Sequence, residues 1–132
     1  CRGVIGIDFI VNDGAVYAIE LNPRFVATLD TIESSTGVNL VRLHIDACHG
    51  TIPKSVPAPV KYAMRRILFA DRPLVITEDL IRFMPWVADI PVPPAQFEEG
   101  GAIISVFGEG HDLVDAEKSL DTTIMVVTQY IQ

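Results

Sequence analysis

The alternation of apolar and polar positions predicts two β-strands at the start of the chain. The runs GVIGIDFIV (residues 3–11) and AVYAIELN (residues 15–22) are rich in β-branched and aromatic residues. The NDG between them is a common hairpin connection. We therefore expect an antiparallel hairpin that begins almost at the first residue.

Apolar residues at helical spacing predict two helices after Pro23. The first carries its apolar positions from Leu29 onward and is placed to end at Gly37. The second has Asn39 as a plausible N-cap, an apolar face of leucine, valine and isoleucine, and an end at Gly50.

The second half of the chain contains two further strands and a long helix. Residues 61–70 (KYAMRRILFA) and residues 102–110 (AIISVFGEG) have the composition of strands. From Asp112, a candidate N-cap, apolar residues recur at helical spacing as far as Ile131.

The connecting segments are less regular. Residues 54–60 form a proline-punctuated connector, and residues 76–83 (ITEDLIRF) are ambiguous between a strand and a helical turn. Residues 86–101 are expected to be rich in loop, because their prolines cannot donate to a β-ladder. The order β-β-α-α-β-(β)-β-α indicates an α+β fold, a mostly antiparallel sheet packed with helices.

Composition places the chain among ordinary soluble domains. A chain of 132 residues with 49% hydrophobic residues can bury a core as one compact domain. Its formal charge is -7, and no basic cluster exceeds Arg65–Arg66, so we expect no nucleic-acid partner.

A cytoplasmic protein is the expectation from the remaining composition. No apolar run approaches the ~20 residues that a membrane helix needs, so no membrane partner is expected. Cys1 and Cys48 have neither the spacing of metal ligands nor that of a disulfide framework. Because the first residue is Cys and a strand pattern follows almost at once, we interpret the chain as a piece of a longer protein.

Three polar residues interrupt the apolar pattern of the predicted hairpin. Glu20 and Asn22 lie on one face of the second strand, because side chains alternate between faces. Asp8 is the carboxylate of the first strand. Whether these side chains meet depends on the turn that joins the strands.

The length of the loop decides which residues are paired. A two-residue Asp-Gly loop pairs Asp8 with Ile19 and puts the carboxylates on opposite faces. A three-residue Asn-Asp-Gly loop places Asp8 opposite Ala18 and makes Glu20 its diagonal neighbour. The sequence leaves both arrangements open.

If the polar residues share a face, they offer ligands suited to magnesium. Asp8, Glu20 and Asn22 would then present carboxylate and amide oxygens, which bind this hard cation at ~2.0–2.1 Å. Side by side, two carboxylates repel each other unless a cation or an arginine such as Arg24 compensates. The alternative is that Asp8 and Glu20 simply face solvent on a half-exposed sheet.

The stretch GIDFIVNDGAVYAIELNPRF, followed by TGVNLVRLHIDACHG, resembles the metal-binding end of the ATP-grasp superfamily. The C-terminal GGAIISVFGEGHDLVDAEKSL is similar to the branch that holds biotin carboxylase, carbamoyl phosphate synthetase and related carboxylate-amine ligases. The resemblance implies that residues 1–132 form the C-terminal portion of an ATP-grasp domain. Its adenine-contacting and phosphate-holding parts would then lie upstream.

The resemblance also implies roles for individual residues. Asp8 and Glu20 correspond to two magnesium-ligating acids, with Glu20 bridging two ions. Asn22 corresponds to the amide ligand of the second ion, so that Glu20 and Asn22 hold the ATP cofactor through its metals. Arg24 corresponds to the catalytic arginine that faces the transferred phosphoryl group. The implied cofactors are ATP and two Mg²⁺ ions, for which Mn²⁺ can substitute.

The implied activity is an ATP-dependent ligase that joins a carboxylate to an amine through an acyl phosphate. Its partners would be small-molecule carboxylate and amine substrates and the upstream part of the same protein, with a homodimer left open. Thr28 stands where biotin carboxylase has a glutamate base, which argues against that enzyme. A bicarbonate-using carboxylase and a non-catalytic ATP-grasp-like binding module are the alternatives.

Other polar and aromatic residues carry simpler interpretations. His44 and His49 are five residues apart and do not share a helical face, so we expect no metal role for them. We expect Trp86 in the core or at a contact between subdomains rather than in a substrate cleft.

Overall fold

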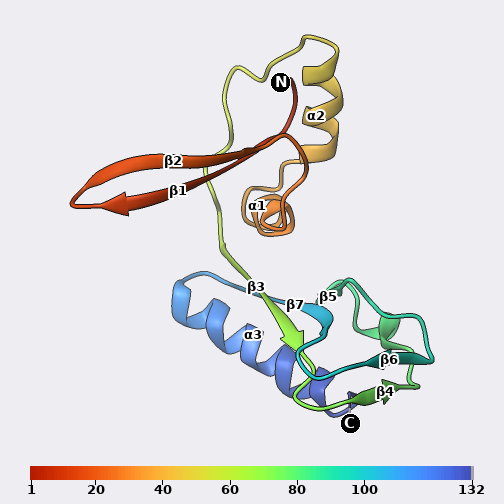
Figure 1. The fold of residues 1–132 in the computed structure, drawn as a ribbon. Helices are drawn as coiled ribbons and strands as arrows, with labels where there is room; N and C mark the ends of the chain where they lie inside the picture. The colour runs from red at the N-terminus through yellow and green to blue at the C-terminus, as the bar shows by residue number, and fades with distance from the viewer. Residues whose placement is uncertain (132) are drawn as a thin grey trace. The chain divides into compact units, whose positions relative to one another are not determined.

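The computed structural model describes residues 1–131 and divides into two compact units (Figure 1). Unit 1 is Cys1–Pro59 and unit 2 is Val60–Gln132. Length and composition predict one compact domain, whereas each unit has its own strands and helices. The fold is α+β, with antiparallel strand pairing throughout the described sheets, as predicted.

Unit 1 begins with the predicted hairpin, formed by β1 (Gly6–Asn12) and β2 (Ala15–Asn22). The loop has two residues, Asp13 with φ 49° and Gly14 with φ 78°. Two successive residues with positive φ are the mark of a type I′ turn, whose twist matches that of the strands. The NDG signal therefore produced a hairpin with the shorter of the two loops considered.

Two helices complete unit 1 at the predicted places. Helix α1 (Leu29–Thr36) ends at Gly37, whose φ of 70° lets its N–H donate to the Glu33 carbonyl at 2.8 Å. Helix α2 (Leu40–Cys48) begins after Asn39, whose side chain accepts a hydrogen bond from the Arg42 N–H at 2.7 Å. Both caps depend on residues that are close together in the sequence, so the helix ends could be predicted from it.

Unit 2 is built on a three-stranded antiparallel sheet with the order β3-β7-β5. Strand β3 (Tyr62–Phe69) and strand β5 (Val87–Ala88) pair with opposite edges of β7 (Ala102–Gly110). Helix α3 (Leu113–Thr128) starts after its predicted N-cap, Asp112, and packs against β7 and β3.

The segment between β3 and β7 contains more regular secondary structure than the sequence predicts. The segment 86–101, predicted to be rich in loop, contains β5 and also β6 (Ala95–Phe97). Strand β6 pairs with β4 (Leu74–Ile76), a strand too short to produce a clear sequence pattern. The ambiguous residues 76–83 become the last residue of β4 and a 3-10 helix, η1 (Leu80–Phe83).

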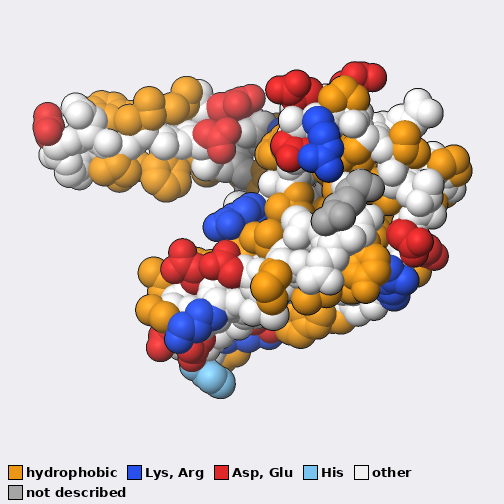
Figure 2. All heavy atoms as spheres, turned by 90° about the horizontal axis from the view of Figure 1, so that it is seen from below, with side chains coloured by type: hydrophobic (Ala, Val, Ile, Leu, Met, Phe, Trp, Pro, Cys, Tyr) orange, Lys and Arg blue, Asp and Glu red, His pale blue; other side chains and the backbone are white. Residues whose placement is uncertain are grey.

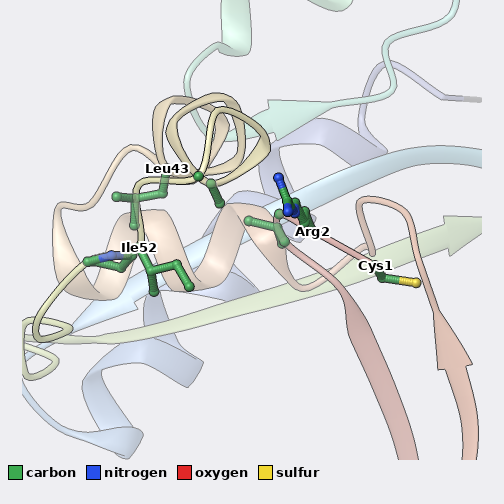
Figure 3. Close-up of a pocket in the computed structure, with 9 residues that line it drawn as sticks. Cys1, Arg2, Leu43 and Ile52 are labelled. Atoms are coloured by element: carbon green, nitrogen blue, oxygen red, sulfur yellow. The ribbon is translucent and has the colours of Figure 1, made fainter.

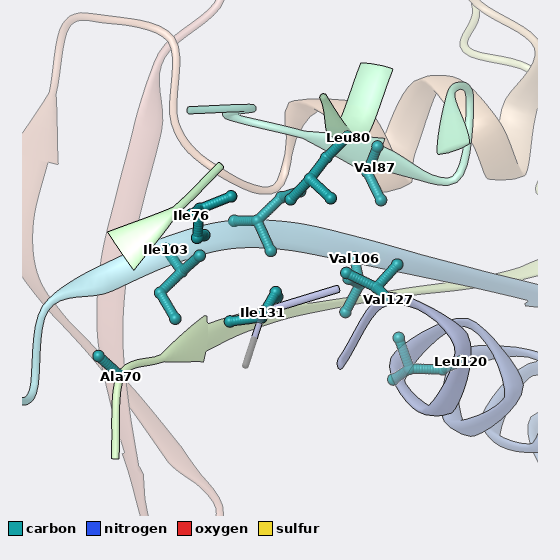
Figure 4. Packing of buried hydrophobic residues seen from close by; sticks show 10 residues of the cluster. Ala70, Ile76, Leu80, Val87, Ile103, Val106, Leu120, Val127 and Ile131 are labelled. Atoms are coloured by element: carbon teal, nitrogen blue, oxygen red, sulfur yellow. The ribbon is translucent and has the colours of Figure 1, made fainter. Parts of the chain in front are cut away.

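The hydrophobic core lies in unit 2, between the sheet, η1 and α3 (Figure 4). Its buried members are Ala70, Ile76, Leu80, Val87, Ile103, Ile104, Val106, Leu120, Val127 and Ile131. Gly108 of β7 allows the helix to approach closely, because a Cβ at that position would lie 2.3 Å from the Leu120 backbone nitrogen. No helix among residues 1–131 is both long and apolar enough to span a bilayer.

Candidate metal site on the hairpin

A β-bulge brings the two carboxylates of the hairpin together. Near the turn, the two-residue loop sets a register in which Phe9 pairs with Ala18, so that Asp8 would meet Ile19. The register shifts between Asp8 and Phe9, and Asp8 instead pairs with Glu20. Ile19 is thus the extra residue, and directly paired residues point to the same face of a sheet.

The structure therefore differs from both alternatives that the sequence left open. The turn is the two-residue form, which by itself separates the carboxylates, yet Asp8 and Glu20 still share a face. Their pairing is direct rather than the diagonal one expected from the longer loop. A bulge is set by cross-strand packing and twist, and no residue type around Ile19 signals it.

Asn22 completes the polar group on this face. It pairs with Gly6 at the base of the hairpin, and its side-chain nitrogen donates a hydrogen bond to Asp8 Oδ2 at 3.2 Å. Asn22 is 8% exposed, whereas Asp8 and Glu20 are exposed. The amide thus fixes one carboxylate from a protected position, and its own oxygen is a further acceptor.

Arg24 follows the group in a tight turn. Its backbone N–H donates to the Asn22 carbonyl at 2.8 Å, and its guanidinium Nη1 donates to the Phe25 carbonyl at 3.3 Å. Strand pairing joins Asp8 to Glu20, and one side-chain hydrogen bond joins Asn22 to Asp8. Arg24 is connected to that group through the backbone.

The ligand chemistry of the group fits a magnesium ion that is shared with a phosphate. Two carboxylates and an amide are hard oxygen donors, the type that Mg²⁺ prefers. Across the described chain, His, Cys, Asp and Glu side chains form no metal-ligating cluster of three or more. Magnesium is commonly held by one or two carboxylates together with substrate phosphates and water, which is the kind of set that Asp8 and Glu20 provide.

His44 makes structural contacts within unit 1. Its Nδ1 accepts a hydrogen bond from the Val4 N–H at 3.1 Å, and its ring centroid lies 4.8 Å from that of Phe25. These contacts connect α2 to the segment before β1 and to the segment after β2.

A hollow of about 430 Å³ lies elsewhere in unit 1 (Figure 3). It is lined by the N-terminal segment, by α2 and by the loop after α2, with Cys1, Arg2, Leu43 and Ile52 around it. Its lining contains neither Asp nor Glu. The carboxylate pair therefore belongs to the surface of the hairpin and not to this hollow.

The hairpin matches a known protein family. A family model described as an ATP-grasp domain matches residues 1–28, which include Asp8, Glu20, Asn22 and Arg24. The chain is 39% identical over 49 residues to the large chain of carbamoyl phosphate synthase from Thermoanaerobacter sp.. That match covers 37% of this chain and 5% of the synthase.

A longer match extends into unit 2. An uncharacterized protein of Methanocaldococcus jannaschii is 32% identical over 108 residues, which are 82% of this chain. The match spans 26% of the archaeal protein, so the chain corresponds to only part of the length of these relatives.

A solved structure shares the fold. Phosphoribosylamine–glycine ligase from Thermotoga maritima superposes with a TM-score of 0.63 over 92% of this chain and 33% of the ligase. The sequence identity is 18%, so the likeness concerns the fold. Together with this shared fold, the family model on the hairpin and the carbamoyl phosphate synthase matches support an ATP-grasp superfamily member.

Proposed function

We propose that the chain is the metal-binding portion of an ATP-dependent ligase that joins a carboxylate to an amine through an acyl phosphate. The observation that carries the proposal is the pairing of Asp8 with Glu20 on one face of the hairpin, with Asn22 bonded to Asp8. Family membership supports it, since relatives of this chain include a synthase and a ligase by name.

In this proposal the three polar residues hold magnesium and, through it, ATP. Asp8 and Glu20 would supply carboxylate oxygens, Glu20 to both ions, and Asn22 would supply its amide oxygen. When bound, Mg²⁺ neutralises the charge of the phosphates during transfer. Manganese, which accepts the same oxygen ligands, would substitute. The bond from Asn22 to Asp8 orients the carboxylate before the metal arrives.

Arg24 is the proposed catalytic cation. Its side chain is exposed and its Nη1 donates to the neighbouring Phe25 carbonyl, an interaction that a charged oxygen would readily replace. A guanidinium fits the oxygens of a phosphoryl group in a bidentate geometry and stabilises the charge that they carry in the transition state.

The reaction itself requires no protein nucleophile. A substrate carboxylate oxygen attacks the γ-phosphorus of ATP, the bond to the bridging oxygen breaks, and ADP leaves with that electron pair. The amine nitrogen then attacks the acyl carbon, phosphate departs, and a proton is lost to give the amide. ATP is consumed because a free carboxylate is a poor acyl donor.

The hairpin surface supports the proposal that an upstream part of the same protein completes the site. Figure 2 shows apolar side chains along the hairpin. Its large apolar residues are between 50% and 66% exposed, more than a stable isolated sheet would leave in water. They are Ile7, Phe9, Ile10, Val11, Val16, Tyr17, Ile19 and Leu21.

The test is Mg²⁺-dependent ADP release by the complete protein that contains this chain. Carboxylate and amine pairs are scanned against bicarbonate, with Glu20→Gln as the site variant. Asp13→Asn, at the tip of the same hairpin, is the matched control because it removes the same charge at an exposed position. We expect release that requires both an organic acid and an amine, that is lost in Glu20→Gln, and that is kept in Asp13→Asn.

Other outcomes contradict the proposal in distinguishable ways. ADP release driven by bicarbonate without an organic acid would make the protein a carboxylase. Release that is equal in Glu20→Gln and in the unaltered protein would remove the metal assignment. A complete absence of ATP turnover with every pair would favour a non-catalytic binding module.

A further inference from the structure

A groove in unit 2 lies between helix α3 and the segment that runs from η1 to β5. Its volume is about 540 Å³, within the range of roughly 300–1,000 Å³ typical of small-molecule sites. Arg82, Met84 and Trp86 line one side, and the other side is formed by residues 119–127 of α3. Every residue of this lining belongs to unit 2, so the groove is independent of the hairpin site.

Trp86 presents an aromatic face from a fixed backbone. Its backbone N–H donates to the Phe83 carbonyl at 2.9 Å, and its backbone carbonyl accepts from the Phe107 N–H at 2.9 Å. Its side chain was expected in the core or at a contact between subdomains, yet the residue is 43% exposed and lines the groove. The backbone of Trp86 is fixed by these two bonds, and its indole supplies a flat aromatic surface on which a ring can stack.

Arg82 is the one charged residue in the lining of the groove. Its guanidinium carbon lies 4.3 Å from the ring centroid of Tyr130 and 5.2 Å from that of Phe83. Stacking of this kind uses the face of the guanidinium and leaves its N–H groups directed outward in the plane. One of them lies 3.6 Å from Glu78, a pair exposed enough to be weak.

The two threonine hydroxyl groups of the helix wall do not supply donors for an anion. Thr122 Oγ1 donates to the Lys118 carbonyl at 2.8 Å, and Thr123 Oγ1 donates to the Ser119 carbonyl at 3.1 Å. With their hydrogens committed to the helix, these oxygens can only accept. Ser119 Oγ accepts from the Glu109 N–H at 3.3 Å and is the remaining hydroxyl of the wall. Arg82 is the cation that a negative group in the groove would meet.

We propose that this groove binds a small ligand of the aromatic-carboxylate class. The ring stacks on Trp86, beside Met84, and the carboxylate receives hydrogen bonds from Arg82. The site is additional to the ATP and substrate sites proposed for the ligase, and its test does not depend on ligase activity.

The tryptophan itself provides the measurement. Trp86 is the single tryptophan of the 132-residue chain, so its fluorescence reports on this groove. The probes are benzoate, benzyl alcohol as a neutral ring of similar shape, and acetate as an anion without a ring. We expect a saturable fluorescence change with benzoate, with an affinity at least about fivefold greater than that of either other probe.

Two arginine variants sharpen the assignment. Arg82→Gln is expected to weaken benzoate binding by about tenfold, because a charge-assisted hydrogen bond is lost. Arg72→Gln is the matched control, since Arg72 lies in the same unit, is exposed and is outside the groove. We expect it to bind benzoate like the unaltered chain.

The proposal is overturned if benzoate causes no saturable change, or if benzyl alcohol binds as well as benzoate. Equal weakening by Arg82→Gln and Arg72→Gln would also overturn it, because the effect would then come from net charge. The ranking of the three probes is measured on the unaltered chain, so it tests the proposed ligand class even if Arg82→Gln does not fold.

Discussion

The two units of this protein differ in where their apolar side chains lie. Among residues 1–131, every buried hydrophobic side chain belongs to unit 2, whereas the one buried residue of unit 1 is the polar Asn22. Unit 2 thus contains the core, and unit 1 contains the residues proposed to perform the chemistry. Stability and function are therefore expected to respond to different substitutions.

The difference arises because a helix covers the sheet of unit 2, whereas the hairpin of unit 1 exposes apolar side chains on both faces. In unit 2, α3 packs against the β3-β7-β5 sheet. Side chains on the face of the sheet that meets the helix are therefore covered by it. In unit 1, both faces of the hairpin expose apolar side chains. An isolated two-stranded ribbon of this kind is only marginally stable in water.

The largest expected effect is at the contact between β7 and α3. In Gly108→Ala, the new Cβ would lie 2.3 Å from the Leu120 nitrogen and 2.6 Å from the Ala116 oxygen, both backbone atoms that cannot move alone. We expect a loss of about 4 kcal/mol or more in the free energy of unfolding. Urea denaturation followed by Trp86 fluorescence measures it in unit 2.

Gly6→Ala is the comparison in unit 1. There the new Cβ would meet the Val26 side chain, at 2.4 Å from its Cγ1, and not backbone. We expect the unfolding transition of unit 2 to stay unchanged. A shift as large as that of Gly108→Ala would show that the two units do not fold separately.

Truncation of a core residue should be the next largest effect. Ile104 is fully buried in β7, and Ile104→Ala is expected to cost about 2–5 kcal/mol through lost transfer energy and the cavity left behind. Ile10→Ala in the hairpin, at a residue 56% exposed, should cost less than about 1 kcal/mol. Equal costs in thermal denaturation would contradict the division between the units.

A polar network around the buried Ser105 in unit 2 predicts a moderate effect. Ser105 Oγ donates to Asp89 Oδ2 at 2.6 Å and accepts from Arg65 Nη2 at 2.8 Å, and Arg65 Nη2 also lies 2.7 Å from Asp89 Oδ2. Ser105→Ala removes the hydroxyl but keeps the ion pair, so we expect a loss of about 1–3 kcal/mol. Ser35→Ala, whose hydroxyl bonds to the Ile32 carbonyl at the surface of α1, is the control and should be nearly neutral in the same urea titration.

The smallest expected effect comes from removing the bulge itself. Deleting Ile19 leaves a regular ladder in which Phe9 still pairs with Ala18 and Asp8 still pairs with Glu20. We therefore expect the Mn²⁺ affinity of the deletion variant to stay within about threefold of that of the unaltered protein. A complete loss of affinity would mean that the distortion at Ile19, and not the pairing, makes the site.

Local signals were predictable from the sequence, and pairing between distant residues was less so. The hairpin connection at residues 12–14 and the caps at Asn39 and Asp112 depend on residues a few positions apart, and the structure confirms them. The length of the hairpin loop was left open. Strand β6 was missed because neighbouring prolines favour loop and because its partner β4 has only three residues.

The candidate site illustrates the same limit. The sequence left open whether the two carboxylates share a face, and neither loop considered explains how Asp8 meets Glu20. The bulge depends on how the hairpin twists and packs over its whole length, which no short motif encodes. The position of Arg24 beyond Pro23 followed from the sequence, while its bond to the Phe25 carbonyl did not.

The most direct test of the central claim is metal binding at the Asp8–Glu20 pair. Mn²⁺ binding to the complete protein, in the presence of a non-hydrolysable ATP analogue, can be followed by the electron paramagnetic resonance signal of free Mn²⁺. We predict that Asp8→Asn and Glu20→Gln each weaken binding by at least about tenfold, while Asp13→Asn changes it by less than about twofold. If all three variants bind Mn²⁺ alike, the metal site is not on this hairpin.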